Sequence, residues 1–385
     1  MINKQDGFTM TELLITMTIF VFAIAAISNI FVPLLTQFKQ QSRLAETQIE
    51  GAVGLDILRR DLEQAGFGLP WVIPTAITYQ EGSSTTAGSI PAPNTFNDST
   101  ANPPRAIMTV NNNAGLSGSD YLVIKATSVA TNSAAMKWTH VTGTAAGGSS
   151  VKTWSSSIED LNTNDRVIVL IPSRGENNQH ILVNNGAAFS AQFNASAFPA
   201  NFTPSTVNDI FLVYGVDPST DLRMPFNRAD YFIENVTGTT IPSRCAAGTG
   251  ILMKYFISHA NGDRTGGMPL LDCVADIQII FRLDRDGDGT IESTTDVLNT
   301  LTGTPLTAQE LREQLKEVRV FILAHEGQKD PTYTYPNSTI ILPPASDPGA
   351  GSGRTFNFTT SGITSWQNYR WKVYTIVVKP NNLRA

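Results

Sequence analysis

The sequence contains few of the residues that carry out metal or nucleophilic chemistry. Of its 385 residues, only 2 are cysteine and 4 are histidine. Cys245 and Cys273 do not form a C-x-x-C pair and the histidines are dispersed, which argues against a zinc site. No G-x-S-x-G, H-E-x-x-H or P-loop motif occurs. We therefore expect that the protein is not an enzyme.

Basic residues are also scarce. The 27 Lys and Arg residues are outnumbered by 33 Asp and Glu residues, for a net charge of −6. Proteins that bind nucleic acid usually carry a basic patch or stripe, and no run of cations occurs here. We expect the chain by itself to have no nucleic-acid partner. Its 41% hydrophobic residues are sufficient for a large core.

One long stretch near the N-terminus contains no charge. From Leu13 to Phe38 the sequence is mostly Leu, Ile, Phe, Val, Ala and Met, long enough to cross the roughly 30 Å hydrocarbon core of a bilayer. A secretory signal has its small-residue cleavage site after the apolar core. Here the only obvious small residue for a peptidase, Gly7, precedes the apolar stretch. A cut there would leave the membrane helix on the mature protein.

Glu12 lies at the beginning of this apolar stretch. A carboxylate in or near hydrocarbon costs on the order of 2.5 to 3.5 kcal/mol, so it needs a partner. If the chain is cut between Gly7 and Phe8, the new α-amino group is the natural counter-charge, supplied by a neighbouring copy or a related protein. Alternatively, Glu12 lies at the edge of an uncleaved signal anchor and extends into water.

The segment "GFTMTELLITM" resembles the N-terminal signal of type IV prepilins and type II secretion pseudopilins. The resemblance implies cleavage after Gly7 and N-methylation of Phe8 by a prepilin peptidase. It also implies assembly through packed helices, in which Glu12 helps to recruit the subunit. Major and minor pilins and the inner-membrane assembly machinery are then the partners. The protein would span the bacterial inner membrane once, with its head in the periplasm, and later enter an extracellular pilus fibre or tip.

The helix is expected to continue beyond the membrane. Leu55, Leu58 and Leu62 recur at helical spacing and predict an apolar stripe that docks on the protein's own head. We expect a kink at Pro33 and a softer point at Gly51 and Gly54. Gly66 and Gly68, followed by Pro70, predict the end of the helix.

Residues beyond the helix predict a β-rich head with one short helix. Thr307 to Leu315 forms that helix, because Thr307 and Glu310 have the spacing of a capping box. Residues 80–104, rich in Ser, Thr, Pro, Gly and Asn, predict an exposed loop or connector. Strands are expected at 120–130, 165–173, 209–216, 229–236, 251–259, 273–283, 316–325, 338–344 and 369–380.

These elements predict an α+β, pilin-like fold: a long N-terminal helix packed on a large, mainly antiparallel β head. The expected organisation is a leader at 1–7, a helix at 8–65 with 8–38 in the membrane, and a head at 66–385. A variable Ser/Thr-rich region at about 80–200 resembles no family.

Four segments resemble minor pilins of the PilW family: "RRDLEQAGFG", "MPLLDCVADIQIIFRLDRDGDGT", "LREQLKEVRVFILAHEG" and "YRWKVYTIVVKPNNL". From this resemblance, residues from about 250 to 385 are expected to form the PilW-like part of the head. The resemblance implies a minor pilin at or near the tip of a type IV pilus, which helps to prime assembly and to present a PilY-type tip protein. The alternatives are a type II secretion pseudopilin, or a membrane-anchored calcium-dependent binding module or adhesin.

The sequence "DRDGDGTIE" has acidic residues at alternate positions and a glycine for the sharp turn, like the first half of an EF-hand loop. Such a loop predicts structural Ca²⁺ binding, with Thr290 donating its backbone carbonyl. The twelfth position, normally Glu, is Thr295 here. The alternative is a solvated Asp/Gly turn. The expected ligands are Asp284, Asp286, Asp288, Thr290, Glu292 and Asp296.

The two cysteines, Cys245 and Cys273, form an even pair. In a chain that leaves the cytoplasm, such a pair predicts one disulfide, with a free buried pair as the alternative.

Overall fold

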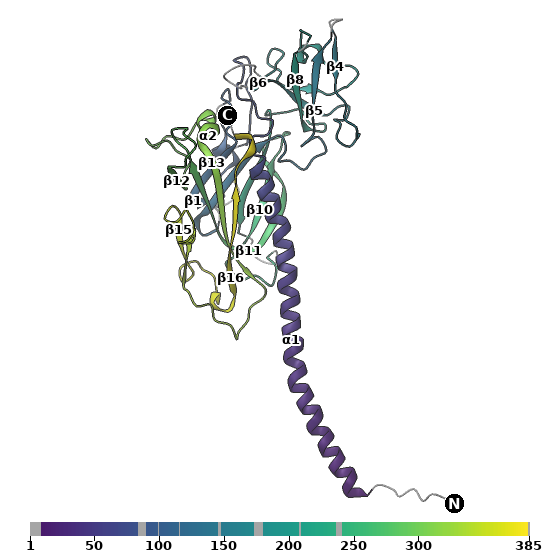
Figure 1. The fold of residues 1–385 in the computed structure, drawn as a ribbon, viewed down its shortest axis with the longest axis vertical. Coiled ribbons are helices and arrows are strands. Elements are labelled where there is room, and N and C mark those ends of the chain that lie inside the picture. The colour runs from purple at the N-terminus through teal and green to yellow at the C-terminus, as the bar shows by residue number, and fades with distance from the viewer. Residues whose placement is uncertain are drawn as a thin grey trace, which may run out of the picture.

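The computed structural model describes residues 9–83, 90–98, 100–114, 116–144, 148–172, 180–207, 209–235 and 241–383. Helix α1 (Met10–Glu63) runs far out of a β-rich head, and its C-terminal part lies along the head (Figure 1). The paired strands of the head are antiparallel. The expected α+β, pilin-like fold is therefore confirmed.

Helix α1 is unbroken across Pro33, and its ribbon curves gently (Figure 1). Thr9 caps its first turn, two residues beyond Gly7, which lies outside the described residues together with Phe8. The helix ends at its C-cap, Gln64. Gly66 follows with a φ of 86°, in the left-handed region that favours glycine. The predicted stop signal is confirmed.

The main sheet of the head has eight strands, and β12 pairs with β11 outside the main path. Its strand order joins distant parts of the chain, because β2 (Ser119–Ala126) pairs with β9 (Asn227–Glu234). In this order the strands are β1 (Ile107–Ala114), β2 (Ser119–Ala126), β9 (Asn227–Glu234), β10 (Gly250–Ile257), β11 (Arg264–Leu283), β13 (Leu315–Glu326) and β16 (Arg370–Val378), with β12 at Ser293–Thr295.

Both faces of this sheet are buried around β11 and β13. Val320 and Ile322 share a core with Leu58 and Leu62 of α1. Phe321, between them, packs in a separate cluster on the other side, with residues of β14 (Thr339–Leu342) and β15 (Arg354–Asn357). Because successive side chains of a strand point to opposite faces, a strand covered on both sides needs a continuous apolar run. That requirement explains the sequence of β13.

A second sheet of six strands is inserted between β2 and β9. It lies at the end of the head away from the N-terminus (Figure 1). Trp71 and Val72, which follow α1, donate backbone hydrogen bonds to the carbonyl of His180 and connect the insert to the rest of the head. Its strands are β3 (Trp138–Gly143), β4 (Ser149–Val151), β5 (Arg166–Pro172), β6 (His180–Leu182), β7 (Ala191–Gln192) and β8 (Ile210–Asp217).

The prediction of an exposed loop at 80–104 is wrong for part of the residues that the structure describes there. Glu81 is 3% exposed and Phe96 is 1% exposed. The Phe96 ring stacks on Tyr121 of β2, with ring centroids 4.4 Å apart. The segment therefore covers the main sheet. Composition could not predict the burial of this segment. The burial depends on the single ring of Phe96 and on carboxylates that are neutralised by cations distant in the sequence.

Helix α2 (Ala308–Gln314) confirms the predicted short helix, with the capping box of Thr307 and Glu310 present. Each expected strand segment overlaps an observed strand. Strands β1, β3, β4, β6, β7, β12 and β15 were not predicted. The 3₁₀ helices are η1 (Pro93–Phe96), η2 (Leu116–Gly118), η3 (Ala200–Phe202), η4 (Trp366–Asn368) and η5 (Asn381–Leu383).

Candidate functional site

The first part of α1 is suited to a membrane or to a bundle of helices. Residues Met10–Phe31 form a candidate membrane span of 22 residues with a mean hydropathy of 2.3. The head buries none of the most apolar part of this span. This span is shorter than the expected 8–38. Exposed apolar side chains continue at Leu34, Leu35 and Phe38. An apolar surface this long, without cover from its own head, requires lipid or other helices around it.

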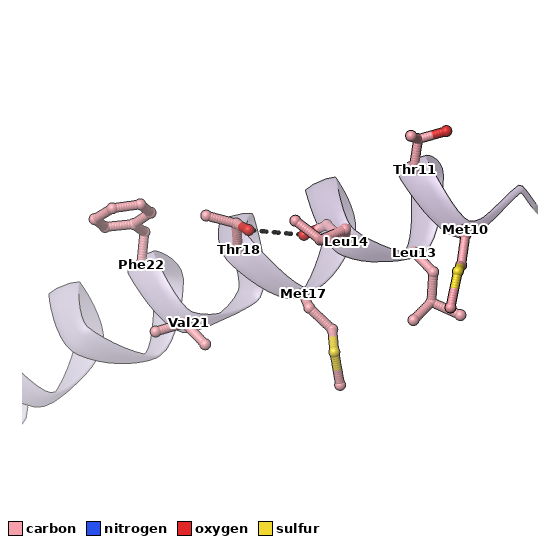
Figure 2. Close-up of a pocket in the computed structure, with 8 residues that line it drawn as sticks. All are labelled: Met10, Thr11, Leu13, Leu14, Met17, Thr18, Val21 and Phe22. Carbon is pink, nitrogen blue, oxygen red and sulfur yellow. Dashed lines mark hydrogen bonds between the residues drawn. The ribbon is translucent and has the colours of Figure 1, made fainter.

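The surface of this segment is apolar although it contains hydroxyl groups. Figure 2 shows the apolar side chains of Leu13, Met17 and Val21 projecting from the same side of the helix. The hydroxyl of Thr18 donates to the carbonyl oxygen of Leu14 at 2.7 Å (Figure 2). Because the helix backbone satisfies this hydroxyl, the residue can lie in an apolar environment at little cost.

Glu12 takes part in a capping box that the sequence analysis did not identify. Its carboxylate accepts hydrogen bonds from the backbone N–H of Thr9 at 2.9 Å and from the Thr9 hydroxyl at 2.8 Å. The T-x-x-E spacing was the available signal. Glu12 thus has a partner in its own chain at the first turn. Its pairing with the amine of Phe8 in another subunit stays a prediction.

The last part of α1 lies close to the main sheet. A Cβ on Gly54 would lie 1.8 Å from the carbonyl oxygen of Leu270, and one on Gly51 would lie 2.9 Å from Leu271 Cδ1. Both contacts are with β11. The expected softer point is therefore a site of close packing, and at Gly54 only glycine lets the helix backbone reach the backbone of the strand.

A buried ion pair fastens the same part of α1. The Nζ atom of Lys254, on β10, lies 2.6 Å from Oδ2 of Asp61, and the Tyr231 hydroxyl donates to the same carboxylate. Burial raises the pKa of Asp61, and the positive charge of Lys254 opposes that rise. The helix and sheet are therefore joined by a charge pair that solvent barely reaches.

The acidic loop after β11 brings four of its expected ligands together. Asp284, Asp286, Asp288 and Glu292 each present a carboxylate oxygen within 4.8 Å of the others. Asp284 is buried, and the other three are exposed. The backbone N–H groups of Gly287 and Gly289 donate to Asp284 and hold the turn around it. Hard oxygen ligands at this spacing fit a cation such as Ca²⁺.

Two expected ligands behave differently. Asp296 accepts a hydrogen bond from Asn111 of β1 at 2.8 Å and lies outside the cluster. The Thr290 hydroxyl lies within hydrogen-bond distance of both Asp288 and Glu292, and the hydroxyl and backbone N–H of Thr290 lower the pKa of Asp288 by hydrogen bonding to it. The role expected for the Thr290 carbonyl stays a prediction. Lys316 forms an ion pair with the cluster, with its Nζ atom 3.4 Å from Asp284.

The predicted disulfide between Cys245 and Cys273 is present, with Cα atoms 4.8 Å apart. Cys273 is in β11, and Cys245 precedes β10. The backbone N–H of Ala246 donates to Nε2 of His325, and burial lowers the pKa of that imidazole to about 3. The bridge therefore lies in a dry part of the head, with a neutral histidine beside it.

Comparison with known proteins gives one match. A family model described as the prokaryotic N-terminal methylation motif matches residues 2–28, which include Gly7, Phe8 and Glu12. No curated protein and no solved structure matches the chain. With the apolar helix, the motif supports a type IV pilin-like protein, processed as a prepilin for a pilus or pseudopilus and anchored in the inner membrane.

Proposed function

We propose that the protein is a minor pilin of the PilW family, incorporated at or near the tip of a type IV pilus. There it helps to prime assembly and presents a PilY-type tip protein. The observation that carries the proposal is the match to the methylation motif at the start of a helix whose membrane segment is exposed along its length. Prepilin peptidase cuts after Gly7 and methylates Phe8. The mature subunit then leaves the membrane and packs in the filament by means of this helix.

The width of the head supports a place at the tip. The main sheet is covered on both faces, and a second sheet is inserted beside it. Such a head fits poorly at every position of a thin fibre but meets no neighbour above it at the tip. A type II secretion pseudopilin shares the processing and the helix and is the closest alternative.

The intact mass and N-terminal sequence of the protein from its own membranes test the processing. We expect a mature chain that begins at methylated Phe8. A Gly7→Val variant should retain residues 1–7, while an Asp6→Asn variant should be processed normally. A wild-type chain that keeps Met1 would contradict the proposal and favour a membrane-anchored binding module.

We further propose that the acidic loop binds Ca²⁺ as a structural clamp, through Asp284, Asp286, Asp288 and Glu292. The convergence of these four carboxylates supports it, because like charges at such short separation repel unless a cation lies between them. This loop is also the observation that favours the second candidate function, a calcium-dependent binding module.

Thermal unfolding in calcium and in chelator tests the clamp. Asp286→Asn with Asp288→Asn should remove the stabilisation that calcium gives to the wild type. Asp296→Asn, which removes one carboxylate charge outside the cluster, should keep it. An identical melting temperature of the wild type in calcium and in chelator would show that the loop is a plain turn.

A further inference from the structure

A polar pocket of about 480 Å³ opens beside α2, between that helix and the segments that follow α1 and precede β1. Trp71, Asp98, Arg105, Gln309 and Arg312 are among the residues that line it. Helix α2 lies toward the end of the head that is remote from the N-terminus (Figure 1). The pocket belongs to the head alone, so it exists whether or not α1 enters a filament.

Arg312 forms no ion pair in the part of the chain that the structure describes, although the negative charge of Glu313 acts on it and opposes the lowering of its pKa. Its guanidinium carbon lies 4.6 Å from the centre of the Trp71 ring, and Trp71 also stacks on His180. Burial lowers the pKa of Arg312 to about 10. The neighbouring Glu313 instead accepts a hydrogen bond from Gln309. An arginine held over an indole ring presents its N–H groups as a fork that fits a planar acceptor.

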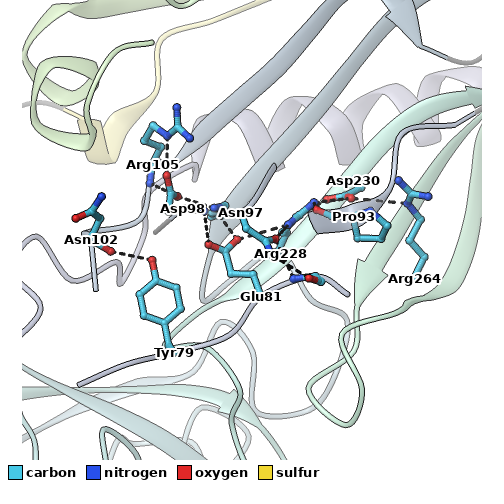
Figure 3. A network of polar contacts seen from close by, with 12 residues as sticks. Tyr79, Glu81, Pro93, Asn97, Asp98, Asn102, Arg105, Arg228, Asp230 and Arg264 are labelled. Atoms are coloured by element: carbon cyan, nitrogen blue, oxygen red, sulfur yellow. Dashed lines mark hydrogen bonds and ion pairs between the residues drawn. The ribbon is translucent and has the colours of Figure 1, made fainter. Parts of the chain in front are cut away.

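The one carboxylate among these lining residues is already neutralised. Oδ1 of Asp98 accepts from Nε of Arg105, and Oδ2 accepts from Lys125, both at 2.6 Å. Figure 3 shows Arg105 at one end of this network, with its remaining nitrogens directed away from Asp98.

The network as a whole contains more positive than negative groups. Its carboxylates are Glu81, Asp98 and Asp230, and its cations are Arg105, Lys125, Arg228 and Arg264. Within these described ion pairs one cation has no carboxylate of its own. Among the charged residues that line the pocket, Arg105 and Arg312 outnumber Asp98, so the pocket is positively charged although the whole chain is acidic.

We propose that this pocket binds a carboxylate, supplied by an acidic segment of a partner protein. Guanidinium groups recognise carboxylates through short, charge-assisted hydrogen bonds, and the ligand charge would compensate the half-buried Arg312. Asn102 and Gln309 line the same pocket and supply further polar groups for the backbone of such a segment. The volume accommodates one or two side chains with their backbone.

Binding to the full-length protein in detergent micelles tests this proposal, with an acetylated and amidated tetraglutamate peptide as the probe. We expect saturable binding of the peptide, and binding about ten-fold weaker with Arg312→Gln, as expected for the loss of one charged hydrogen-bonded contact. Arg59→Gln removes the same charge from an exposed position on α1 and should leave binding unchanged. If Arg312→Gln does not fold, Arg312→Lys provides the test. It keeps the charge but lacks the forked N–H groups of the guanidinium, so weaker peptide binding is expected for it too.

Glutarate distinguishes the source of the carboxylate. If the pocket takes a protein segment, glutarate binds much more weakly than the peptide. Glutarate binding as tight as that of the peptide would overturn a protein segment as the occupant. The site itself would be overturned if the peptide did not bind, or if it bound folded Arg312→Gln and the wild type equally.

Discussion

The two ends of α1 have the same backbone geometry but different partners. From Met10 to Phe31 the helix is apolar on every side and exposed along its length. From Gly51 to Glu63 only a stripe is apolar, and Leu58 and Leu62 on that stripe are 0% exposed. An apolar surface on all sides indicates a surrounding of lipid or other subunits, whereas a stripe indicates one fixed neighbour. One helix therefore serves assembly at one end and the stability of the head at the other.

The carboxylates of the two ends differ in the same way. Glu12 bonds only within its own first turn, to Thr9, among the described residues. Asp61 is bound to Lys254 and Tyr231 of two different strands. A change at Asp61 must therefore disturb the fold, while a change at Glu12 leaves the head untouched.

The largest effect is expected from Lys254→Met, which leaves Asp61 buried without its cation. We expect a loss of about 3 to 5 kcal/mol in the free energy of unfolding, as for other broken buried ion pairs. Denaturant unfolding of the full-length protein in micelles measures it. Lys372→Met is the matched control, because Lys372 pairs with Glu326 at 2.9 Å on the surface and should cost less than about 1 kcal/mol.

The pH dependence of the Lys254→Met variant sharpens this test. Lys254 opposes the rise that burial causes in the pKa of Asp61, so without Lys254 this pKa is raised further in the folded variant than in the folded wild type. Stability of the variant should therefore increase, relative to the wild type, as the pH falls through the raised pKa toward the ordinary value of 3.8. A constant difference at all pH values would contradict the buried charge.

A smaller effect is expected from Gly54→Ala. The sign of its change in the free energy of unfolding shows whether packing or helix propensity dominates at this position. Alanine is favoured over glycine in a helix by about 1 kcal/mol. At position 54, however, the added Cβ would overlap the carbonyl of Leu270, so we expect a net loss of about 2 kcal/mol. At the exposed Ala52, the change to glycine should cost only the propensity term. A higher melting temperature for Gly54→Ala would show that helix and sheet do not touch there.

Local patterns in the sequence predicted much of this architecture. The uncharged run, the glycines at 66 and 68, and the capping box of Thr307 with Glu310 act within a few residues, and the structure contains each. The alternation and β-branched runs of β5, β11 and β13 were equally visible. Four of the expected ligands of the acidic loop converge because they are close in sequence.

Features that depend on distant residues were not predictable. The burial of residues near Glu81 and Phe96 depends on Lys125, Tyr121 and Arg228, far along the chain. Asp296 is directed to β1 by Asn111, which no local spacing indicates. The pairing of Asp61 with Lys254 and the stacking of Arg312 on Trp71 likewise require the folded sheet. Charge composition gives the number of such groups but not their partners.

The smallest change in folding energy is expected from Glu12→Gln, which tests the end of α1 that serves assembly. The amide still accepts a hydrogen bond from Thr9 but carries no charge to attract the amine of Phe8. We expect unchanged melting of the head and roughly ten-fold less protein in sheared filaments relative to membranes, equivalent to about 1.4 kcal/mol. Thr9→Ala removes the cap and keeps the charge, so it should assemble normally. If Thr9→Ala impaired assembly as much as Glu12→Gln did, Glu12 would act by starting the helix, and the exposed end of α1 would need no partner charge.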